Sequence, residues 1–131
     1  MKLDGGCNMK RLPDTELEVM KALWAAGEDT PRAVLEQALE PFGWATNTVN
    51  TYLTRLEKKG FLSVARDRRG NRYTALVTQE DYQAFDSKAV LSQLYGSPRN
   101  FVAALVRGGL DRGEIDQLRS LLDELEEEKH D

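Results

Sequence analysis

The sequence predicts a mostly helical α+β protein whose two parts differ in character. Apolar residues recur at helical spacing from residue 14 to residue 59, and two strand-like runs separated by turn residues follow in 61–77. Helical spacing returns after residue 78 and continues almost to the end. The 131 residues, 40% hydrophobic and 31% charged, are typical of a soluble globular chain with enough apolar side chains for a core.

The first two helices are expected to be short. The first begins near Asp14, where Asp14 or Thr15 would accept hydrogen bonds from the first backbone N–H groups, and it ends at Gly27. In Thr30-Pro31, a capping hydroxyl before a proline predicts the start of the second helix, which ends before Pro41. The residues expected to face the core are Leu17, Met20, Leu23 and Trp24 in the first helix, and Val34, Leu35, Ala38 and Leu39 in the second.

The third helix, 46–59, has the clearest pattern. Its apolar residues follow the spacing i, i+3, i+4, i+7, and Gly60 ends it. Two strands, 61–65 and 72–77, are predicted to form a hairpin with its turn at Gly70-Asn71. Three helices followed by a hairpin are the order of a winged helix-turn-helix domain, which we assign to residues 11–77. The stripe of the third helix consists of Val49, Tyr52, Leu53 and Leu56.

The opposite side of the third helix has the residue types of a DNA-reading surface. Threonine and asparagine are weak helix formers, so their abundance there needs another reason. Asparagine pairs with adenine, threonine contacts base edges or thymine methyl groups, and arginine and lysine bind guanine or phosphate. The recognition helix (about 46–59) and the basic wing (about 61–77) are therefore expected to contact DNA through Thr46, Asn47, Thr48, Asn50, Thr51, Thr54, Arg55, Lys58, Arg68 and Arg69. Arg66 and Arg72 also lie in the hairpin and are expected to grip phosphates.

The charge distribution supports this surface although the chain as a whole is acidic. The net charge is −4, but the stretch from Ala45 to Tyr73 holds seven basic and two acidic residues. Such a basic stretch is the electrostatic footprint of phosphate binding. The acidic C-terminal part would repel DNA and is expected to point away from it.

Residues 78–131 are expected to form a helical dimerisation domain. Thr78–Asp81 resembles a capping box, the first helix runs to about Tyr95, Ser97-Pro98 starts the next, and Asp111 caps the last, whose tail 126–131 should fray. A helical piece of this size is marginal alone, so burial against a second copy is favoured over packing on the first domain. The expected contact residues are Val90, Leu94, Phe101, Val102, Leu105, Ile115, Leu118 and Leu122.

Several classes are disfavoured. The single histidine, His130, lies in the tail, and no Cys–His pair, metal-ligand cluster or phosphate-binding glycine loop exists, so neither an enzyme nor a metal or cofactor is expected. No apolar run is long enough for membrane insertion. Residues 1–10 are expected to be disordered, and Cys7, the only cysteine, suits a reducing cytoplasm. A ligand-responsive regulator from another winged-helix family and a winged-helix protein-interaction module stay open as alternatives.

Several segments of the chain carry the pattern of a known family: Glu16–Met20 with Leu23-Trp24, Trp44–Thr51, Thr54–Leu62, Leu94-Tyr95-Gly96 and Glu114–Arg119. The most specific part is T-x-x-T followed by T-R-L-x-K-K-G. On these residues the chain resembles the penicillinase-repressor family, which includes β-lactamase and methicillin-resistance repressors and copper-responsive relatives, and the likeness covers about Leu12 to Leu125. The resemblance implies a homodimeric transcriptional repressor that binds palindromic double-stranded operator DNA and is released by an upstream signal.

The resemblance also implies a further partner, a sensor membrane metalloprotease that triggers cutting of the repressor at an Asn-Phe bond. Alignment places that bond near Ala104–Val106, where this chain has no such pair. Asn100-Phe101 lies about one helical turn earlier, and packing explains both residues adequately. Proteolytic release is therefore not predicted from the sequence. The cysteine cluster of the copper-responsive members is also missing, so copper sensing is not expected.

Overall fold

The computed structural model describes residues 9–130, with side chains up to Lys129. The chain divides into two compact units, the first ending at Ser87 and the second beginning at Lys88. The first unit contains α1 (Asp14–Ala26), β1 (Thr30–Pro31), α2 (Arg32–Leu39), the 3-10 turn η1 (Glu40–Phe42), α3 (Thr46–Lys58), β2 (Leu62–Asp67), β3 (Gly70–Ala75) and most of α4 (Gln79–Val90). The second contains the π-helical turn η2 (Leu91–Tyr95), α5 (Pro98–Arg107) and α6 (Arg112–His130).

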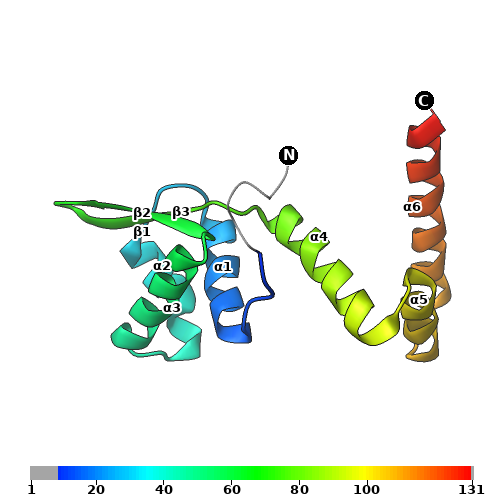
Figure 1. Cartoon of the computed structure of the whole chain (residues 1–131), viewed down its shortest axis with the longest axis horizontal. Coiled ribbons are helices and arrows are strands. Elements are labelled where there is room, and N and C mark those ends of the chain that lie inside the picture. Colours follow the sequence, from blue (N-terminus) through cyan, green and yellow to red (C-terminus); the bar gives the residue numbers. More distant parts are fainter. Residues whose placement is uncertain (1–8, 131) are drawn as a thin grey trace. The chain divides into compact units, whose positions relative to one another are not determined.

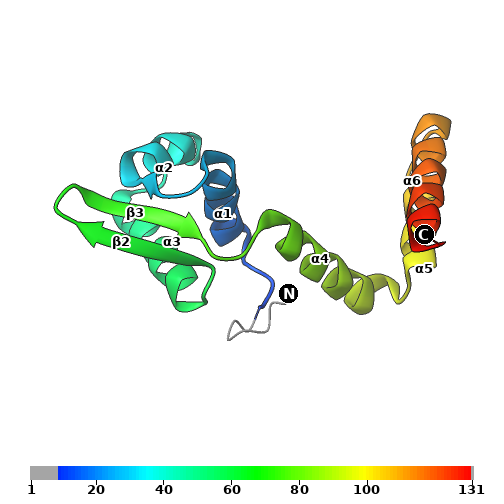
Figure 2. The same ribbon diagram turned by 90° about the horizontal axis from the view of Figure 1, so that it is seen from above.

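The first unit is a winged helix. Its antiparallel sheet has the order β1-β3-β2, and α1, α2 and α3 lie together on one side of it (Figure 1). Seen from above, the β2–β3 hairpin extends beyond the helices as a two-stranded arm (Figure 2). The shared core joins all of these elements and consists of Leu12, Val19, Met20, Leu23, Leu35, Leu39, Val49, Leu53, Leu56, Phe61, Leu62, Tyr73, Val77 and Tyr82.

The starts of the first two helices differ from the sequence expectation. Pro13 precedes α1, and no side chain caps it, so neither Asp14 nor Thr15 has the predicted role. Thr30-Pro31 does not cap α2 but pairs with β3 as a short edge strand, opposite Tyr73 and Arg72. The Thr30 hydroxyl donates instead to the carbonyl of Gly27 at 2.8 Å. This strand was not predictable locally, because its partner lies some 40 residues away.

The second helix buries less than its pattern suggested. Leu35 and Leu39 are buried, whereas Val34 and Ala38 are exposed, so their assignment to the core is wrong. A helix of eight residues packs only one narrow stripe on the core, and in α2 this stripe consists of Leu35 and Leu39, which are four residues apart. The turn that follows ends at Gly43, whose φ of +68° suits glycine.

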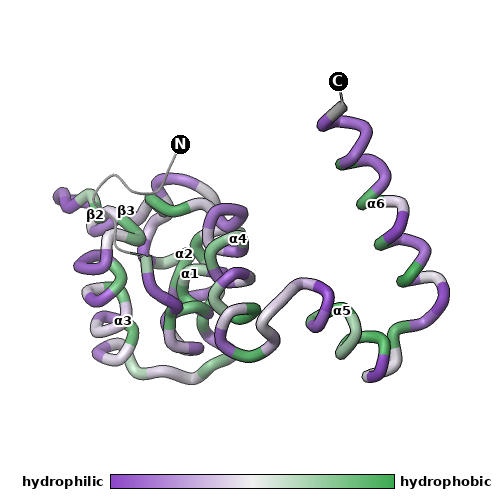
Figure 3. Tube along the Cα trace, turned by 45° about the vertical axis from the view of Figure 1, so that its right-hand side comes forward, coloured by the Kyte–Doolittle hydropathy of each residue, from purple (hydrophilic) through white to green (hydrophobic). Residues whose placement is uncertain are grey.

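The hairpin has its turn two residues earlier than predicted. Asp67 pairs with Gly70, so the turn residues are Arg68 and Arg69, while Gly70 and Asn71 belong to β3. Gly70 has a φ of +112°, a conformation that only glycine adopts readily. The two arginines therefore occupy the tip of the hairpin, which is hydrophilic in Figure 3.

The first unit continues into α4, beyond the boundary expected at Val77. The Tyr82 ring contacts Trp24, Phe61 and Phe85, with centroid separations of 5.8–6.0 Å. Its hydroxyl accepts a hydrogen bond from the Leu12 amide at 2.7 Å. These contacts attach the start of α4 to the winged helix, so the dividing point lies inside the helix, after Ser87.

Near both ends of the chain, residues that were expected to be disordered or to fray have defined positions. Met9, within the segment 1–10 expected to be disordered, is half-buried and packs on the core. Residues 1–8, including Cys7, lie outside the described residues. At the other end α6 continues to His130, so residues 126–130 are helical in the segment that was expected to fray.

The helices of the second unit begin as predicted. Ser97 Oγ accepts from the Asn100 amide at the start of α5. Asp111 and Glu114 form a reciprocal capping box before α6, with distances of 2.8 and 3.0 Å. The helix predicted from Thr78 to Tyr95 is one α-helix up to Val90 and then a π-helical turn, because Gly96 donates to the carbonyl of Leu91.

Candidate nucleic-acid interface

Helix α3 has one buried face and one polar face. Val49, Leu53 and Leu56 are at most 5% exposed, which fixes the rotation of the helix about its axis. With 3.6 residues per turn, the opposite side centres on residues that are all exposed: Asn47, Thr51, Thr54 and Lys58. The helix thus presents amide, hydroxyl and ammonium groups to solvent along its length.

The predicted DNA-contacting residues fall on the solvent side of this helix and on the hairpin tip. All of them are exposed except Thr48, which is half-buried beside the buried face. Asn50 and Arg55 flank the centre of the polar face on opposite sides. The Thr51 hydroxyl donates to the Asn47 carbonyl at 3.0 Å, so this side chain offers its methyl group and an acceptor oxygen outward.

One flank of α3 is tied to the hairpin. Arg66 donates to both carboxylate oxygens of Glu57, at 2.9 and 3.3 Å. A bidentate pair of this kind fixes orientation as well as distance. Arg66, expected to grip phosphate, is therefore engaged within the protein, and the pair sets the position of β2 against α3. The arginine side chain holds its charge more firmly as well, since Glu57 raises its pKa.

A groove lies between this flank of α3 and the hairpin. Asn50 and Thr54 of α3 line one wall, and Arg66 and Asn71 of the hairpin line the other. The sequence reasoning did not include Asn71, whose place in the groove follows from the hairpin register.

Arg32, at the start of α2, also lines this groove and was missed by the sequence reasoning. Its Nη1 donates to the Tyr73 hydroxyl at 3.4 Å, and its Nε lies 3.0 Å from a Glu36 carboxylate oxygen without hydrogen-bond geometry. Nη2 is buried and has no hydrogen-bond partner among the described residues. Nothing in the local sequence around Thr30-Pro31 indicated that this arginine would reach the hairpin.

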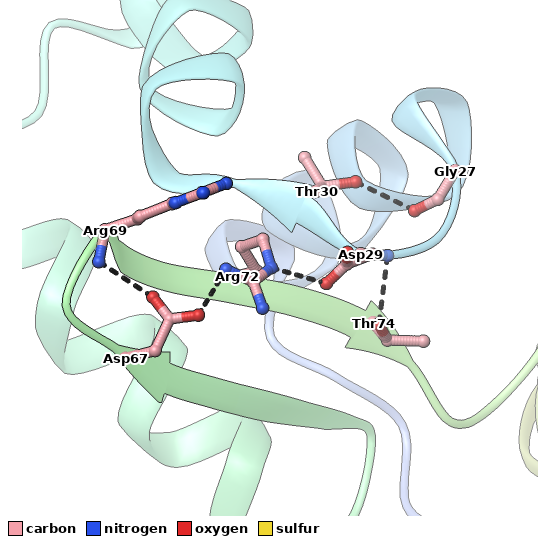
Figure 4. Close-up of polar contacts among 7 residues, drawn as sticks. All are labelled: Gly27, Asp29, Thr30, Asp67, Arg69, Arg72 and Thr74. Atoms are coloured by element: carbon pink, nitrogen blue, oxygen red, sulfur yellow. Dashed lines mark hydrogen bonds and ion pairs between the residues drawn. The ribbon is translucent and has the colours of Figure 1, made fainter.

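A second arginine holds the hairpin close to its turn. Arg72 pairs with Asp29 at 2.8 Å and with Asp67 at 2.6 Å, which joins β3 to the loop before β1 and to the end of β2 (Figure 4). Asp67 also accepts from the Arg69 amide at 2.9 Å, and these donors lower the pKa of its carboxyl. Arg72 is therefore a structural residue of the wing, in contrast to the expected phosphate contact.

The two arginines at the hairpin tip differ from Arg66 and Arg72, which lie in the strands just before and after the turn. Neither Arg68 nor Arg69 has an ion-pair partner among the residues that the structure describes, and both are exposed. In Figure 4 the Arg69 side chain extends away from Asp67, which takes only its backbone amide. The tip thus carries two accessible guanidinium groups on a firmly anchored arm.

The other flank of α3 faces α1. Glu16 of α1 is buried and lies 2.5 Å from Lys59 and 3.8 Å from Arg55. Sequence reasoning missed Glu16, although a signal existed. An acidic residue three and four positions before the core residues Val19 and Met20 occupies the core side of the same helix.

In the second unit, the residues predicted to form a dimer contact are accessible. Leu94, Val102, Leu105 and Leu122 are exposed, and the other four are half-buried. Phe101 contacts the Tyr95 ring with centroids 5.0 Å apart. Figure 3 shows apolar segments alternating with polar ones along α6, as in a helix with one apolar side. Large apolar side chains on these helices therefore have little partner surface within their own unit.

The described part of the chain contains neither a candidate metal site nor a candidate membrane-spanning helix. Residues 9–130 contain no group of three or more His, Cys, Asp or Glu side chains placed to hold a metal ion. No helix there combines the length and apolar character that a membrane crossing requires.

Comparison with known proteins places the chain in a family. Residues 12–124 match the family model described as penicillinase repressor. The penicillinase repressor of Bacillus licheniformis is 31% identical over 121 residues, covering 88% of this chain and 94% of the relative. The transcriptional regulator BlaI of Mycobacterium tuberculosis (strain CDC 1551 / Oshkosh) is 37% identical over 123 residues, covering 90% and 87%.

A solved structure agrees with the sequence comparison for the first unit. The solution structure of the DNA-binding domain of the repressor BlaI is 32% identical, with a TM-score of 0.51, and the match covers 58% of this chain and 93% of that one. The shared architecture is the winged helix of α1–α3 and the hairpin. The chain therefore belongs to the penicillinase repressor family of transcriptional repressors.

Proposed function

We propose that this repressor binds palindromic operator DNA as a homodimer, with α3 in the major groove and the hairpin tip against the DNA backbone. The observation that carries the proposal is the polar side of α3. An amide, hydroxyl and ammonium surface stands opposite a buried aliphatic stripe, with Asn47 and Thr54 near its centre. A major groove accommodates one α-helix, and these residue types match base edges there. The matched DNA-binding domain of BlaI supports the same reading of the first unit.

The arrangement of charge supports a division of labour among the arginines. Arg66 and Arg72 are engaged in ion pairs that hold the hairpin, whereas Arg68 and Arg69 stay accessible at its tip. Phosphate contacts set the register of a protein on DNA, and base contacts provide sequence preference. We therefore assign phosphate binding to the tip and base reading to α3. The acidic second unit would be repelled by DNA.

The proposed dimer uses the second unit. Apolar side chains of α5 and α6 are exposed there, among them Val102 at 40% and Leu122 at 64%. A second copy would cover these side chains and place two α3 helices on two half-sites. Half-sites are then expected about 34 Å apart, one helical turn of DNA, or a multiple of it.

The proposal includes release by an upstream signal and a cytoplasmic location, where operator DNA is present. For the sensor membrane metalloprotease, the chain offers the Asn100–Phe101 bond as the available Asn-Phe pair. That bond lies in the first turn of α5, and Asn100 donates to the Tyr95 carbonyl at 2.9 Å and to Ser97 Oγ at 3.1 Å. A protease needs an extended strand, so cleavage there would require this turn to open first.

Selection of duplexes from a random pool by the full-length protein tests the proposal. The selected sequence is expected to be palindromic, and binding to it should weaken steeply with salt because bound cations are released from the phosphates. Asn50→Ala should lose roughly tenfold in affinity, the value of one good base contact. Gln83→Ala, on the exposed side of α4, serves as the control and should bind normally. A protein that selects no sequence would overturn the proposal.

A further inference from the structure

Glu16 is the only charged residue that is buried in the part of the chain that the structure describes. It lies on the core side of α1 and is 1% exposed. Removing a carboxylate from water costs free energy unless cations or hydrogen bonds compensate it. The elements around Glu16 must therefore be placed so that cationic partners reach its carboxylate.

Both cations that compensate Glu16 come from one end of the recognition helix. Lys59 Nζ lies 2.5 Å from one carboxylate oxygen, and Arg55 Nη1 lies 3.8 Å from the other. Residues four apart share a helix flank, so the two cations approach α1 together. If α3 rolled or slid along α1, the buried carboxylate would lose one or both of its partners. The ion cluster therefore favours one placement of α3.

Arg55 connects this buried cluster to the proposed DNA surface. Its side chain is 58% exposed although its guanidinium lies beside Glu16. The neighbouring Lys59 bonds the carboxylate more closely, so the cluster keeps a net positive charge toward solvent. A guanidinium that a fixed carboxylate attracts to one side samples fewer orientations, so it loses less conformational freedom when it binds.

We propose that Glu16 is a positioning residue for sequence-specific DNA binding, which acts through Lys59 and Arg55 to set the recognition helix and to pre-orient the Arg55 guanidinium. The inference rests on the proposed function and adds a determinant of specificity that does not itself touch DNA. It makes a counterintuitive prediction. Removing the negative charge of Glu16 should impair recognition of the preferred sequence, although it makes the protein more cationic.

The test compares Glu16→Gln with Glu18→Gln, which makes the same charge change on the surface of α1. Affinity is measured for the duplex selected by the full-length wild type and for a scrambled duplex of equal composition, per folded molecule. For Glu16→Gln the ratio of the two affinities should fall roughly tenfold, as for a lost base contact, while binding to scrambled DNA stays equal or rises. For Glu18→Gln the ratio should change by less than about twofold, since exposed ion pairs contribute little.

A second pair of variants decides the matter if Glu16→Gln does not fold. Lys59→Gln removes the ion pair with Glu16 by changing a partly exposed residue. Lys21→Gln, which removes an ion pair on the surface of α1, is its control. Lys59→Gln should lower the affinity ratio, and Lys21→Gln should not. An unchanged ratio in folded Glu16→Gln or in Lys59→Gln would overturn the positioning role. A wild type that does not distinguish the two duplexes would instead refute the proposed function.

Discussion

The two units of this chain solve the problem of burying apolar side chains in opposite ways. In the first unit, Phe61, Met20 and Leu56 are completely or almost completely enclosed by their own unit. In the second, none of the described side chains from Lys88 to Lys129 is buried. Since apolar burial is the main favourable term in folding, the first unit has a much larger internal source of stability than the second. The proposed dimer would supply the partner surface that the second unit lacks.

The units also differ in how ion pairs are used. The first has long-range pairs that join separate elements, such as Arg72 with Asp29 and Arg66 with Glu57. In the second, the one ion pair among the described residues joins Asp116 and Arg119 within a single helix. Pairs between elements fix relative positions, whereas a pair within one turn only supports a helix. The first unit is thus built as a rigid reader of DNA, and under the proposed function the second serves as a surface for assembly.

Truncation of the chain after Ser87 tests the different roles of the two units most directly. The shortened chain should keep a cooperative thermal transition, because the core lies within it. Its affinity for a duplex with two half-sites should fall about 10²- to 10⁴-fold, since the second binding event is no longer intramolecular. Affinity for a single half-site should hardly change, which serves as the control. Equal affinities for the two-site duplex before and after truncation would contradict the role of the second unit.

A matched pair of leucine deletions tests the difference in burial. Leu56→Ala should lower the free energy of unfolding of the first unit by about 2–5 kcal/mol, because the residue is completely buried. Leu121→Ala, at a leucine that is 49% exposed, should leave that transition unchanged and act only through assembly. Chemical denaturation at two protein concentrations measures both effects. A loss of similar size in both variants, independent of concentration, would show that the second unit buries its apolar side chains internally.

The contrast also explains what the sequence could predict. The periodic stripe of α3, from Val49 to Leu56, gave the helix and its polar face correctly, because one buried face dictates such a pattern. The strand β1 and the contacts of Glu16 and Arg32 were missed, since they depend on partners about 40 residues away. The turn was misplaced because Gly70 serves as a turn glycine while pairing with Asp67. Local sequence patterns thus predict the helices and strands, whereas the ion pairs between them become visible only in the folded structure.

Replacement of an exposed leucine by glutamate tests which unit forms the dimer interface. Leu122→Glu introduces a carboxylate in α6, and Leu76→Glu introduces the same group at a similarly exposed site of the first unit, 64% against 59%. Burying an unpaired charge is costly, so Leu122→Glu should raise the dissociation constant of the dimer about a hundredfold or more. Leu76→Glu should leave it unchanged. Sedimentation over a range of concentrations measures the constant, and the reverse ranking would place the interface in the first unit.

The smallest effect concerns the rigidity of the wing. The pKa of the Asp67 carboxyl is lowered because this group accepts hydrogen bonds from the Arg72 side chain, which has the larger effect, and from the Arg69 amide. A depressed folded pKa means that the pair contributes to wing order above the ordinary aspartate pKa of about 3.9 and loses this contribution as the pH falls through the lower folded value. Wing order should therefore be insensitive to pH across the neutral range. Carbon NMR of the Asp67 carboxyl is expected to give a midpoint below the ordinary value, and Arg72→Gln should move it upward. A midpoint that Arg72→Gln leaves in place would mean that the wing is not held by this pair, and the rigid reader would then lose one of the connections that distinguish it from the second unit.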